Sequence, residues 1–390
     1  MNILFYSMMA ISPKNGGTEH ATYSIAKYLQ SKGNACFSSY SSMYDGLHAD
    51  CFDETVYTPI KNFHNGIFRN YIIVKKIDVI INESGGFGTQ KIIHDAVVGL
   101  NIKLIVVHHF EPKWYPKTFK RPTFSSVWHS TAVNKRLLVP YEWLRLNILH
   151  KINVYKDQRS YKSDYDNSDA LIVLSENFIP TIKKYARLRN ADRIFAIPNP
   201  LSYNFYISEN EIKCKEKMVL IVSRLHDKVK RISVALRIWG DVMKDSRSKG
   251  WNLVIIGDGP DRERYDKYIK ENGIKSVSLL GKRTPIEYYK KASIFMMTSI
   301  TEGLPLVLTE SMQLGVVPFA FDTFSSVHDI INEKNGIIVN DMDIDNYTEQ
   351  MLQLMSNEKR LKHVAINAVK SCHRYETNVV GKKWERIINF

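Results

Sequence analysis

Cysteine is scarce in this sequence of 390 residues, and its four cysteines (Cys36, Cys51, Cys214 and Cys372) form no Cys-x-x-Cys pair. Such spacing offers no zinc framework and is typical of proteins of the reducing cytoplasm. No apolar run approaches the roughly 18 residues of a membrane-spanning helix. The opening segment, residues 1–11, lacks basic residues and a small-residue cleavage site, so we expect a first strand there rather than a signal peptide.

Acidic residues are fewer than basic ones, since 40 Asp and Glu stand against 54 Lys and Arg, which gives a net charge of +14. The excess is concentrated between Lys103 and Lys162, where twelve basic residues stand against Glu111, Glu142 and Asp157. A basic surface can serve nucleic acid, anionic lipid or a phosphorylated substrate, or it can be a solvated face without function. Nucleic acid is disfavoured because aromatic residues do not interleave regularly with the basic ones and no recognition motif is present.

Aromatic and basic residues are mixed in this stretch, which suits a peripheral membrane surface on the inner face of the cell membrane. The alternative is that two of its tryptophans belong to a core and that the lysines only keep the protein soluble. The residues concerned are Lys113, Lys117, Lys120, Arg121, Lys135 and Arg136 together with Trp114, Tyr115, Phe119, Phe124, Trp128, Trp143 and Leu144.

The chain alternates short apolar runs with amphipathic stretches, which indicates parallel α/β architecture. Its length suggests about two domains. We expect a helix at 18–33 and strands at 2–11, 77–84, 102–110, 169–175, 217–225, 251–260, 277–282, 292–299 and 316–322.

The segment 193–206 contains Pro198 and Pro200 and has no helical period, so we expect a connector that leaves the first domain near residue 200. The predicted fold class is therefore α/β, with two doubly wound Rossmann-like domains that face a central cleft. We assign residues 1–200 and 201–375 to these domains, and we expect 376–390 to be a helix that packs back toward the first. Ligands of such sheets bind beyond the carboxyl ends of the strands.

Two loops have compositions that suit phosphate. Gly16 and Gly17, after Asn15, lie between a strand and a helix, where the backbone can approach an anion closely, although a plain turn is equally compatible. The segment "SRLHDKVKRI" places Arg224 at a strand end and Lys228 and Lys230 shortly after it. A guanidinium and an ammonium that converge there can neutralise a diphosphate, and a solvated basic loop is the alternative.

Two glutamates bracket the start of a predicted helix. Glu302 follows a strand, the turn 303–306 comes next, and Glu310 lies about two helical turns further on. A carboxylate can accept two hydroxyl hydrogen bonds from a vicinal diol, and a sugar nucleotide has such a diol on its ribose and often another on its hexose. An acidic helix start stabilised by the helix dipole explains Glu310 in part but not Glu302.

At these residues the sequence resembles the retaining glycosyltransferases of family 4, which have the GT-B fold. The segment "SITEGLPLVLTESMQLGVVPFAFD" looks like the family's two-glutamate region, and the resemblance covers nearly the whole chain. The other matching segments are "NGGTEHATYSIAKYLQSKG", "LIVLSENF", "IPNPL", "SRLHDKVKRI", "IIGDGPDRERY" and "LLGK".

The resemblance implies a role for each matching residue. Glu310 would hold the ribose hydroxyls and Glu302 the transferred sugar, while Arg224 and Lys230 would stabilise the leaving diphosphate. Gly16 and Gly17 would approach that diphosphate from the other domain. Further donor-binding positions would be Gly257, Gly281, Lys282, Gly303, Leu304, Pro305 and Leu306.

Departures from the family pattern leave two choices open. The spacing from Arg224 to Lys230 is one residue longer than the commonest form, so Lys228 could take the role of Lys230. The family's cleft histidine falls at "VVHHF", where register favours His109 over His108. Since adjacent strand residues face opposite ways, only one of them can serve.

The implied protein is a cytoplasmic, metal-independent glycosyltransferase that needs no cofactor. It would move a sugar, with retention of configuration, from a nucleotide-diphosphate donor, UDP-linked by preference, to a glycan or lipid-linked acceptor. A sugar-nucleotide epimerase of the same fold is the enzymatic alternative, and a nucleic-acid-binding protein is the non-enzymatic one. The spacing of Asp341, Asp343 and Asp345 is superficially like that of a metal-binding motif, but we expect helix capping there. We also expect a turn or cap at 163–169.

Overall fold

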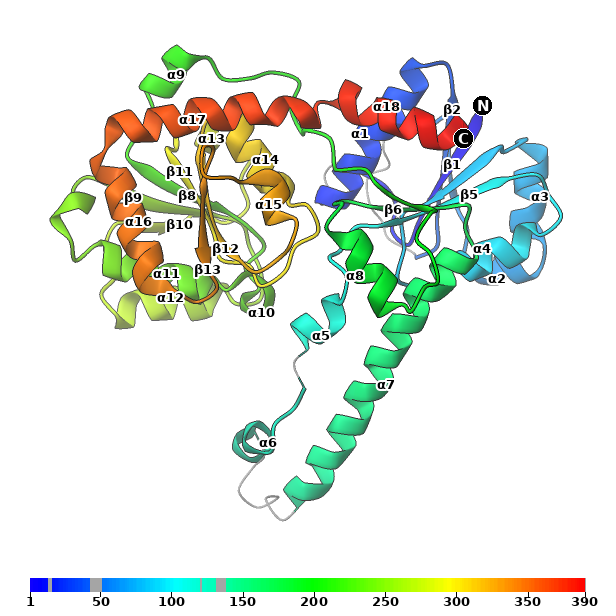
Figure 1. The fold of residues 1–390 in the computed structure, drawn as a ribbon, viewed down its shortest axis with the longest axis horizontal. Helices are drawn as coiled ribbons and strands as arrows, with labels where there is room; N and C mark the ends of the chain where they lie inside the picture. The colour runs from blue at the N-terminus through cyan, green and yellow to red at the C-terminus, as the bar shows by residue number, and fades with distance from the viewer. Residues whose placement is uncertain (13–15, 43–50, 120, 131–137, 390) are drawn as a thin grey trace. The chain divides into compact units, whose positions relative to one another are not determined.

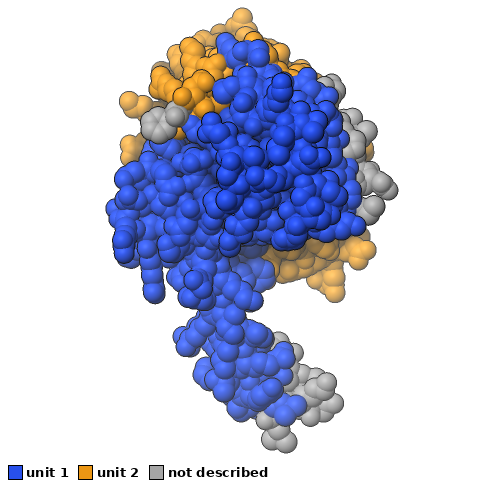
Figure 2. Space-filling view, turned by 90° about the vertical axis from the view of Figure 1, so that its right-hand side faces the viewer, with its two compact units in different colours: residues 1–11, 32–196 blue, residues 12–31, 197–390 orange. Residues whose placement is uncertain are grey.

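The computed structural model describes residues 1–12, 16–42, 51–119, 121–130 and 138–389 of the chain (Figure 1). Asn15, Lys120, Lys135 and Arg136, which were singled out above, lie outside the described residues. The chain forms two compact units, which Figure 2 shows in two colours. Unit 1 comprises residues 1–11 and 32–196, and unit 2 comprises residues 12–31 and 197–390.

Unit 1 contains a seven-stranded parallel sheet in the order β3-β2-β1-β4-β5-β6-β7. Its central strands are buried apolar runs, as parallel strands covered on both faces must be. The strands are β1 (Asn2–Ser7), β2 (Ala35–Tyr40), β3 (Glu54–Tyr57), β4 (Val79–Asn82), β5 (Lys103–His108), β6 (Ala170–Val173) and β7 (Ile194–Ala196). The helices are α2 (Lys61–His64), α3 (Ile67–Val74), α4 (Thr89–Val97), α5 (Trp114–Thr118), α6 (Phe124–Ser130), α7 (Val139–Asp166) and α8 (Phe178–Tyr185).

Three features of unit 1 differ from the sequence-based expectation. Strands β2 and β3 were not predicted, because their polar and small residues hide the apolar alternation. The predicted connector 193–206 begins with strand β7, which pairs with β6. The predicted turn or cap at 163–169 is found as a cap only from Asn167, because α7 continues to Asp166 and Asn167 is its C-cap, with its N–H bonded to the Ser163 carbonyl.

Helices α6 and α7 form an arm that extends from the sheet of unit 1 (Figures 1 and 2). The arm contains much of the basic stretch 103–162. Trp128 is 38% exposed, so it does not belong to a core, and its ring and that of Trp143 both lie near Phe124. The arm is therefore held together by a small aromatic cluster of its own.

Unit 2 contains a six-stranded parallel sheet in the order β10-β9-β8-β11-β12-β13. Its strands are β8 (Met218–Val222), β9 (Asn252–Ile256), β10 (Val277–Leu279), β11 (Ile294–Met297), β12 (Val317–Asp322) and β13 (Ile337–Asn340). Its α-helices are α1 (Gly17–Ser31), α9 (Glu209–Lys213), α10 (Asp227–Lys230), α11 (Ile232–Val242), α12 (Arg262–Glu271), α13 (Ile286–Lys291), α14 (Leu306–Gln313), α15 (Val327–Ile330), α16 (Ile344–Ser356), α17 (Glu358–Cys372) and α18 (Thr377–Asn389), with short 3₁₀ turns η2 (Ser246–Ser248) and η3 (His373–Tyr375).

Helix α1 groups with unit 2 because it packs against α18. A side chain at Gly381 of α18 would come within 2.4 Å of the Tyr28 ring of α1, so the two helices meet at a glycine. The C-terminal helix thus lies against a helix from near the start of the chain. This grouping places residues 12–31 with unit 2, whereas the sequence placed them in a first domain of residues 1–200.

Candidate active site

The loops at the carboxyl ends of β8, β9 and β10 are tied together by backbone hydrogen bonds. The Ser223 N–H donates to the Ile256 carbonyl and the Gly257 N–H donates to the Gly281 carbonyl, each over 2.9 Å. Gly257 has a φ of 137°, and a side chain there would lie 1.8 Å from the Ser223 carbonyl oxygen. Glycine is therefore required at position 257 because two loops approach each other closely there.

Two of the predicted donor-binding residues lie on the third of these loops. Gly281 has a φ of 71° and Lys282 follows it with an exposed side chain. Contact with a nucleotide stays a prediction for Gly257, Gly281 and Lys282.

The basic loop after β8 folds into the short helix α10 and is fastened to the segment after β11. The Thr298 hydroxyl donates to the carbonyls of Lys230 and Arg231 over 2.9 and 3.0 Å. The Ile300 N–H donates to the Val229 carbonyl over 2.8 Å. These bonds hold the backbone of Lys230 beside the segment that carries Glu302.

Lys230 and Glu302 form an ion pair, with Nζ 2.5 Å from Oε1. Their side chains are only 25% and 13% exposed, so the pair is partly shielded from water. Lys228, the alternative, is exposed on the same short helix. Arg224, two residues beyond β8, also has an exposed side chain. The structure thus brings together one lysine and one glutamate of the predicted site and leaves Arg224 open to solvent.

Arg231, a neighbour to which the sequence assigned no role of its own, is a structural residue. Its Nε donates to the Thr298 carbonyl over 2.8 Å, and its guanidinium pairs with Asp341 at 2.8 Å. Asp343 accepts a hydrogen bond from the Asn346 N–H and is the N-cap of α16. The predicted helix cap is confirmed at Asp343, and Asp341 has an ion-pair partner.

The turn between the two glutamates is held from several sides. The Asn199 amide donates to the Leu304 carbonyl over 3.0 Å, and the Ser326 hydroxyl donates to the Gly303 carbonyl. Pro305, in extended conformation, is the N-cap of α14, so the first N–H groups of this helix have no intrahelical acceptor. Such a helix start can receive an anion, but the binding of sugar and phosphate by this turn stays a prediction.

The glycine loop of the N-terminal segment approaches this turn within unit 2. A side chain at Gly17, the first residue of α1, would lie 3.5 Å from the Leu306 side chain. Gly16 accepts a hydrogen bond from the His20 N–H over 3.0 Å and so starts α1. The structure therefore places Gly17 beside Leu306, although their contact with a ligand stays a prediction.

Glu310 already has two hydroxyl partners. Ser202 donates to Oε1 over 2.5 Å and Tyr289 donates to Oε2 over 3.1 Å. Burial raises the pKa of the Glu310 carboxyl above its usual value, and these two hydrogen bonds oppose part of that rise. Sequence reasoning missed Ser202 and Tyr289, because neither belongs to a motif and each meets Glu310 only through the fold.

In unit 1, the two adjacent histidines have different surroundings. His108 is buried, with Nε2 2.9 Å from an Asp164 carboxylate oxygen and its ring stacked on Tyr161 at 4.6 Å. Asp164 also accepts a hydrogen bond from the Gly86 N–H over 2.7 Å. His108 is thus part of the packing between α7 and the sheet.

His109 pairs with a glutamate through one of its two ring nitrogens. Its Nε2 lies 2.7 Å from Oε2 of Glu83, just beyond the end of β4, and the His109 side chain is 8% exposed. Its Nδ1 is buried without a hydrogen-bond partner among the described residues. With Glu83 ionised, Nε2 carries the proton and Nδ1 of the neutral ring is an acceptor for a hydroxyl group. Glu83 was missed, although its place after a buried strand was a usable signal.

No group of three His, Cys, Asp or Glu side chains suited to a metal ion occurs in the described part of the chain. Among the helices of that part, none combines the length and the apolar character needed to cross a membrane.

The fold is shared over the full chain with solved structures such as the UDP complex of Anabaena Alr3699/HepE (TM-score 0.74, 14% identity, covering 100% of both chains). The lipopolysaccharide outer core galactosyltransferase WaaB is similar as well (TM-score 0.69, 18% identity, covering 100% of this chain and 99% of that one). Two Rossmann-like units with parallel sheets make this the GT-B fold, and the predicted fold class is confirmed.

A family model matches the C-terminal part of the chain. Residues 203–371 match the sequence model of the family described as "Glycosyl transferases group 1". This segment lies in unit 2 and contains Arg224, Lys230, Glu302 and Glu310, so the similarity to the family includes these four residues.

Curated relatives extend the similarity in sequence. The amylovoran biosynthesis glycosyltransferase AmsD of Erwinia amylovora is 34% identical over 179 residues, which are 45% of this chain and 49% of the relative. A Campylobacter jejuni alpha-1,4-N-acetyl-D-galactosaminyltransferase, whose name gives a diNAcBac-PP-undecaprenol-linked acceptor, is 26% identical over 57% of this chain and 61% of its own length. The chain thus spans less than two thirds of either relative.

Proposed function

We propose that the protein is a retaining glycosyltransferase that uses a nucleotide-diphosphate sugar, UDP-linked by preference, and transfers the sugar to a hydroxyl of a glycan or lipid-linked acceptor. The observation that carries the proposal is the shielded Lys230–Glu302 pair beside the start of α14, in a segment that matches the group 1 family. The names of the relatives and of the UDP complex support the acceptor class and the base.

The chemistry follows from the charges around this turn. The bond between the anomeric carbon and the diphosphate oxygen breaks while the acceptor oxygen bonds to the same face of that carbon. Negative charge grows on the leaving diphosphate, and in this proposal Lys230, Arg224 and the N–H groups at the start of α14 stabilise it. The acceptor's proton passes to a phosphate oxygen, so no separate base is required, and charge stabilisation by the cations and N–H groups takes the place of a metal ion in this proposal.

In this proposal the two glutamates bind different parts of the donor. Glu302, paired with Lys230, accepts hydrogen bonds from the transferred sugar, and Glu310 accepts them from the ribose. Because Ser202 and Tyr289 occupy Glu310 without a ligand, ribose hydroxyls must displace or share those hydrogen bonds. His109 would be a further acceptor for a sugar hydroxyl through Nδ1, which is buried and would have to become accessible for that contact.

The test is product formation with a panel of UDP- and GDP-sugars. We expect a thermal shift with one UDP-sugar, since a ligand of the folded state raises its stability, and a product that keeps the donor's anomeric configuration by NMR. An isomerised donor without transfer would support the epimerase instead. Activity that vanishes with EDTA and returns with manganese would contradict metal independence.

We also propose that the arm of unit 1 docks on an anionic membrane surface at the inner face of the cell membrane. One face of α7 exposes a stripe of apolar side chains at helical spacing, each at least 43% exposed: Tyr141, Leu144, Ile148, Ile152 and Tyr155. Exposed Lys151, Lys156 and Arg159 belong to the same helix. Apolar side chains with nearby cations suit an interfacial helix, where each cation contributes about 1 kcal/mol near anionic lipid.

The structure changes the choice of variants for this test. Lys117 pairs with Glu111 at 2.6 Å, and Arg121 donates to Asn147 over 2.6 Å, so both have roles within unit 1. Replacing Lys151 and Lys156 with Glu is therefore the better test of membrane binding. We expect this variant to lose sedimentation with anionic vesicles at low salt, while Lys183→Glu with Lys184→Glu on α8, the same charge change, keeps it. Wild-type protein that never binds anionic vesicles would refute the docking.

A further inference from the structure

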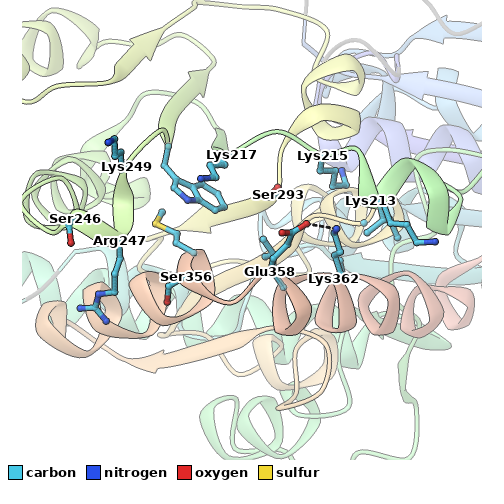
Figure 3. A pocket seen from close by; sticks show the side chains of 16 residues that line it. Lys213, Lys215, Lys217, Ser246, Arg247, Lys249, Ser293, Ser356, Glu358 and Lys362 are labelled. Atoms are coloured by element: carbon cyan, nitrogen blue, oxygen red, sulfur yellow. Dashed lines mark hydrogen bonds and ion pairs between the residues drawn. The ribbon is translucent and has the colours of Figure 1, made fainter.

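A cavity lies in unit 2, at the sheet edge opposite the predicted donor site. It has a volume of about 640 Å³ and is lined by residues that precede β8, β9, β11 and β12, together with parts of α9, η2, α16 and α17 (Figure 3). The donor residues lie beyond the carboxyl ends of the same parallel strands. The cavity and the predicted donor site therefore lie at opposite ends of the strands.

The lining of this cavity is strongly basic. Among the described residues that line it, Glu358 is the only acid, and the basic residues are Lys213, Lys215, Lys217, Arg247, Lys249 and Lys362. Cavities of a few hundred Å³ are the size at which proteins bind small organic molecules. Like charges that converge on one cavity repel each other, and an anion relieves that repulsion.

Two of these cations are neutralised within the protein. Arg247 pairs with Asp245 at 2.8 Å and with Glu349 at 2.9 Å. Lys362 pairs with Glu358, the contact drawn as a dashed line in Figure 3. The four remaining lysines form no ion pair within the described part of the chain: Lys213, Lys215, Lys217 and Lys249.

Lys215 and Trp251 add hydrogen-bond donors that suit an anion. The Lys215 ammonium donates to the carbonyls of Tyr289 and Lys290 over 2.7 and 3.2 Å, which leaves one of its three N–H groups. Burial lowers the pKa of Lys215 to about 7, although the charge of Glu211 opposes the shift. Trp251 is 3% exposed, and its indole N–H has no acceptor among the described residues. A buried N–H without an acceptor is costly, and an oxygen of a ligand would satisfy it.

We propose that this cavity binds a small organic anion that carries two phosphate groups, at a site separate from the donor site. The charges of Lys213, Lys217 and Lys249, together with that of Lys215 in its protonated form, match the charge of two phosphates. Ile212, Met355 and the Trp251 ring offer apolar contact to the body of the molecule. The binding itself does not depend on the reaction proposed above.

The cavity has a direct structural connection to Glu310. Lys215 holds the Tyr289 carbonyl on the cavity side, and the Tyr289 hydroxyl donates to Glu310. Gly315, another lining residue, follows the end of α14, the helix that starts at the 303–306 turn. Resting on the proposed function, we infer that the anion changes the affinity for the nucleotide diphosphate and that the coupling is reciprocal.

The test is calorimetry with fructose 1,6-bisphosphate and inorganic pyrophosphate, with fructose as the neutral comparison. We expect wild type to bind at least one of the two phosphates and not fructose. Lys217→Gln with Lys249→Gln should weaken that binding at least tenfold, whereas Lys382→Gln with Lys383→Gln on α18 should leave it within twofold. Trp251→Phe, which keeps the ring and removes the N–H, should weaken it severalfold.

Three outcomes would overturn the site: no binding of either phosphate, equal binding by the lysine variant and its control, or binding lost only in Arg224→Ala with Lys230→Ala. That last outcome would place the anion at the donor site. Circular dichroism verifies the fold of each variant. A UDP affinity that is unchanged by saturating bisphosphate would overturn the coupling alone, and failure to transfer sugar would leave the binding result intact.

Discussion

The sheet of unit 2 has charged side chains at both edges, and they are held in different ways. At the carboxyl edge, Lys230 pairs with Glu302, and Glu310 accepts hydrogen bonds from Ser202 and Tyr289. At the amino edge, four lysines surround a cavity and none of them pairs with an acid in the described residues. In the first arrangement Lys230, Glu302 and Glu310 each have a partner within the protein, and the second carries an excess of positive charge.

This difference bears on how each edge would bind an anion. A ligand at the carboxyl edge must exchange existing contacts for its own, so its affinity depends on shape and on several hydroxyl groups. A ligand at the amino edge gains from repulsion that is already present, so its affinity depends mainly on charge and should fall steeply with salt. Substitutions at the two edges should therefore have different signatures.

The largest effect is expected from the cations of the carboxyl edge. Lys230→Ala and Arg224→Ala should each lower kcat by roughly 100-fold, because each removes charge stabilisation from the leaving diphosphate. Lys228→Ala is the matched control on the same short helix and should cost less than about threefold. Steady-state kinetics with the preferred UDP-sugar measures all three. If Lys228→Ala is the damaging change and Lys230→Ala is silent, the assignment of Lys230 is wrong.

The two glutamates should separate nucleotide binding from transfer. Glu310→Ala should weaken UDP binding about 30-fold, since hydrogen bonds to a charged group contribute about 1.5–3 kcal/mol. Glu302→Ala should leave UDP binding nearly unchanged and lower kcat, because its partner is the sugar. Calorimetry with UDP and kinetics with the full donor distinguish these effects. Equal loss of UDP affinity in both variants would refute the division.

The adjacent histidines of unit 1 offer a smaller, paired comparison. His109→Ala should lower kcat about tenfold through the loss of one hydrogen bond to the substrate, and it should also destabilise the fold because it leaves buried Glu83 without its imidazole partner. His108→Ala should destabilise the fold by roughly 1–3 kcal/mol, because it leaves buried Asp164 without its imidazole partner, and should not lower kcat in the protein that remains folded. Urea unfolding and kinetics on both variants provide the test. Loss of activity without loss of stability in His108→Ala would reverse the assignment.

The smallest expected effect is on how the stability of the fold depends on pH, through the ionisation of Glu310. Its folded pKa is raised by burial, so the folded state binds more protons than the unfolded state just above the unfolded pKa. The contribution of protonated Glu310 is complete at low pH and is lost as pH rises through the folded pKa. Glu310→Gln should therefore raise Tm by a few degrees at pH 7, and the difference should shrink toward pH 4. A difference that is independent of pH would contradict this explanation.

Much of unit 2 could be predicted from the sequence because its signals are local. The apolar runs that became β8, β9, β11 and β12 stand out from their neighbours, and the cap at Asp343 follows from residue type and position. Strands β2 and β3 were missed because residues such as Ser38 and Ser39 are buried by tertiary packing and not by their own polarity.

The sequence by itself determined the alternation of strands and helices, the glycines at the loops, and the chemical types of Lys230, Glu302 and Glu310, since each depends on residues within one helical turn or one loop. Only the tertiary structure decided which side chains these residues meet. Ser202 lies 108 positions from Glu310 and Glu83 lies 26 from His109, and the lysines of the amino-edge cavity come from segments that no motif connects. Parallel strands with helical crossovers place the same end of every strand at one edge, so partners that are distant in the chain become neighbours only once the sheet has formed.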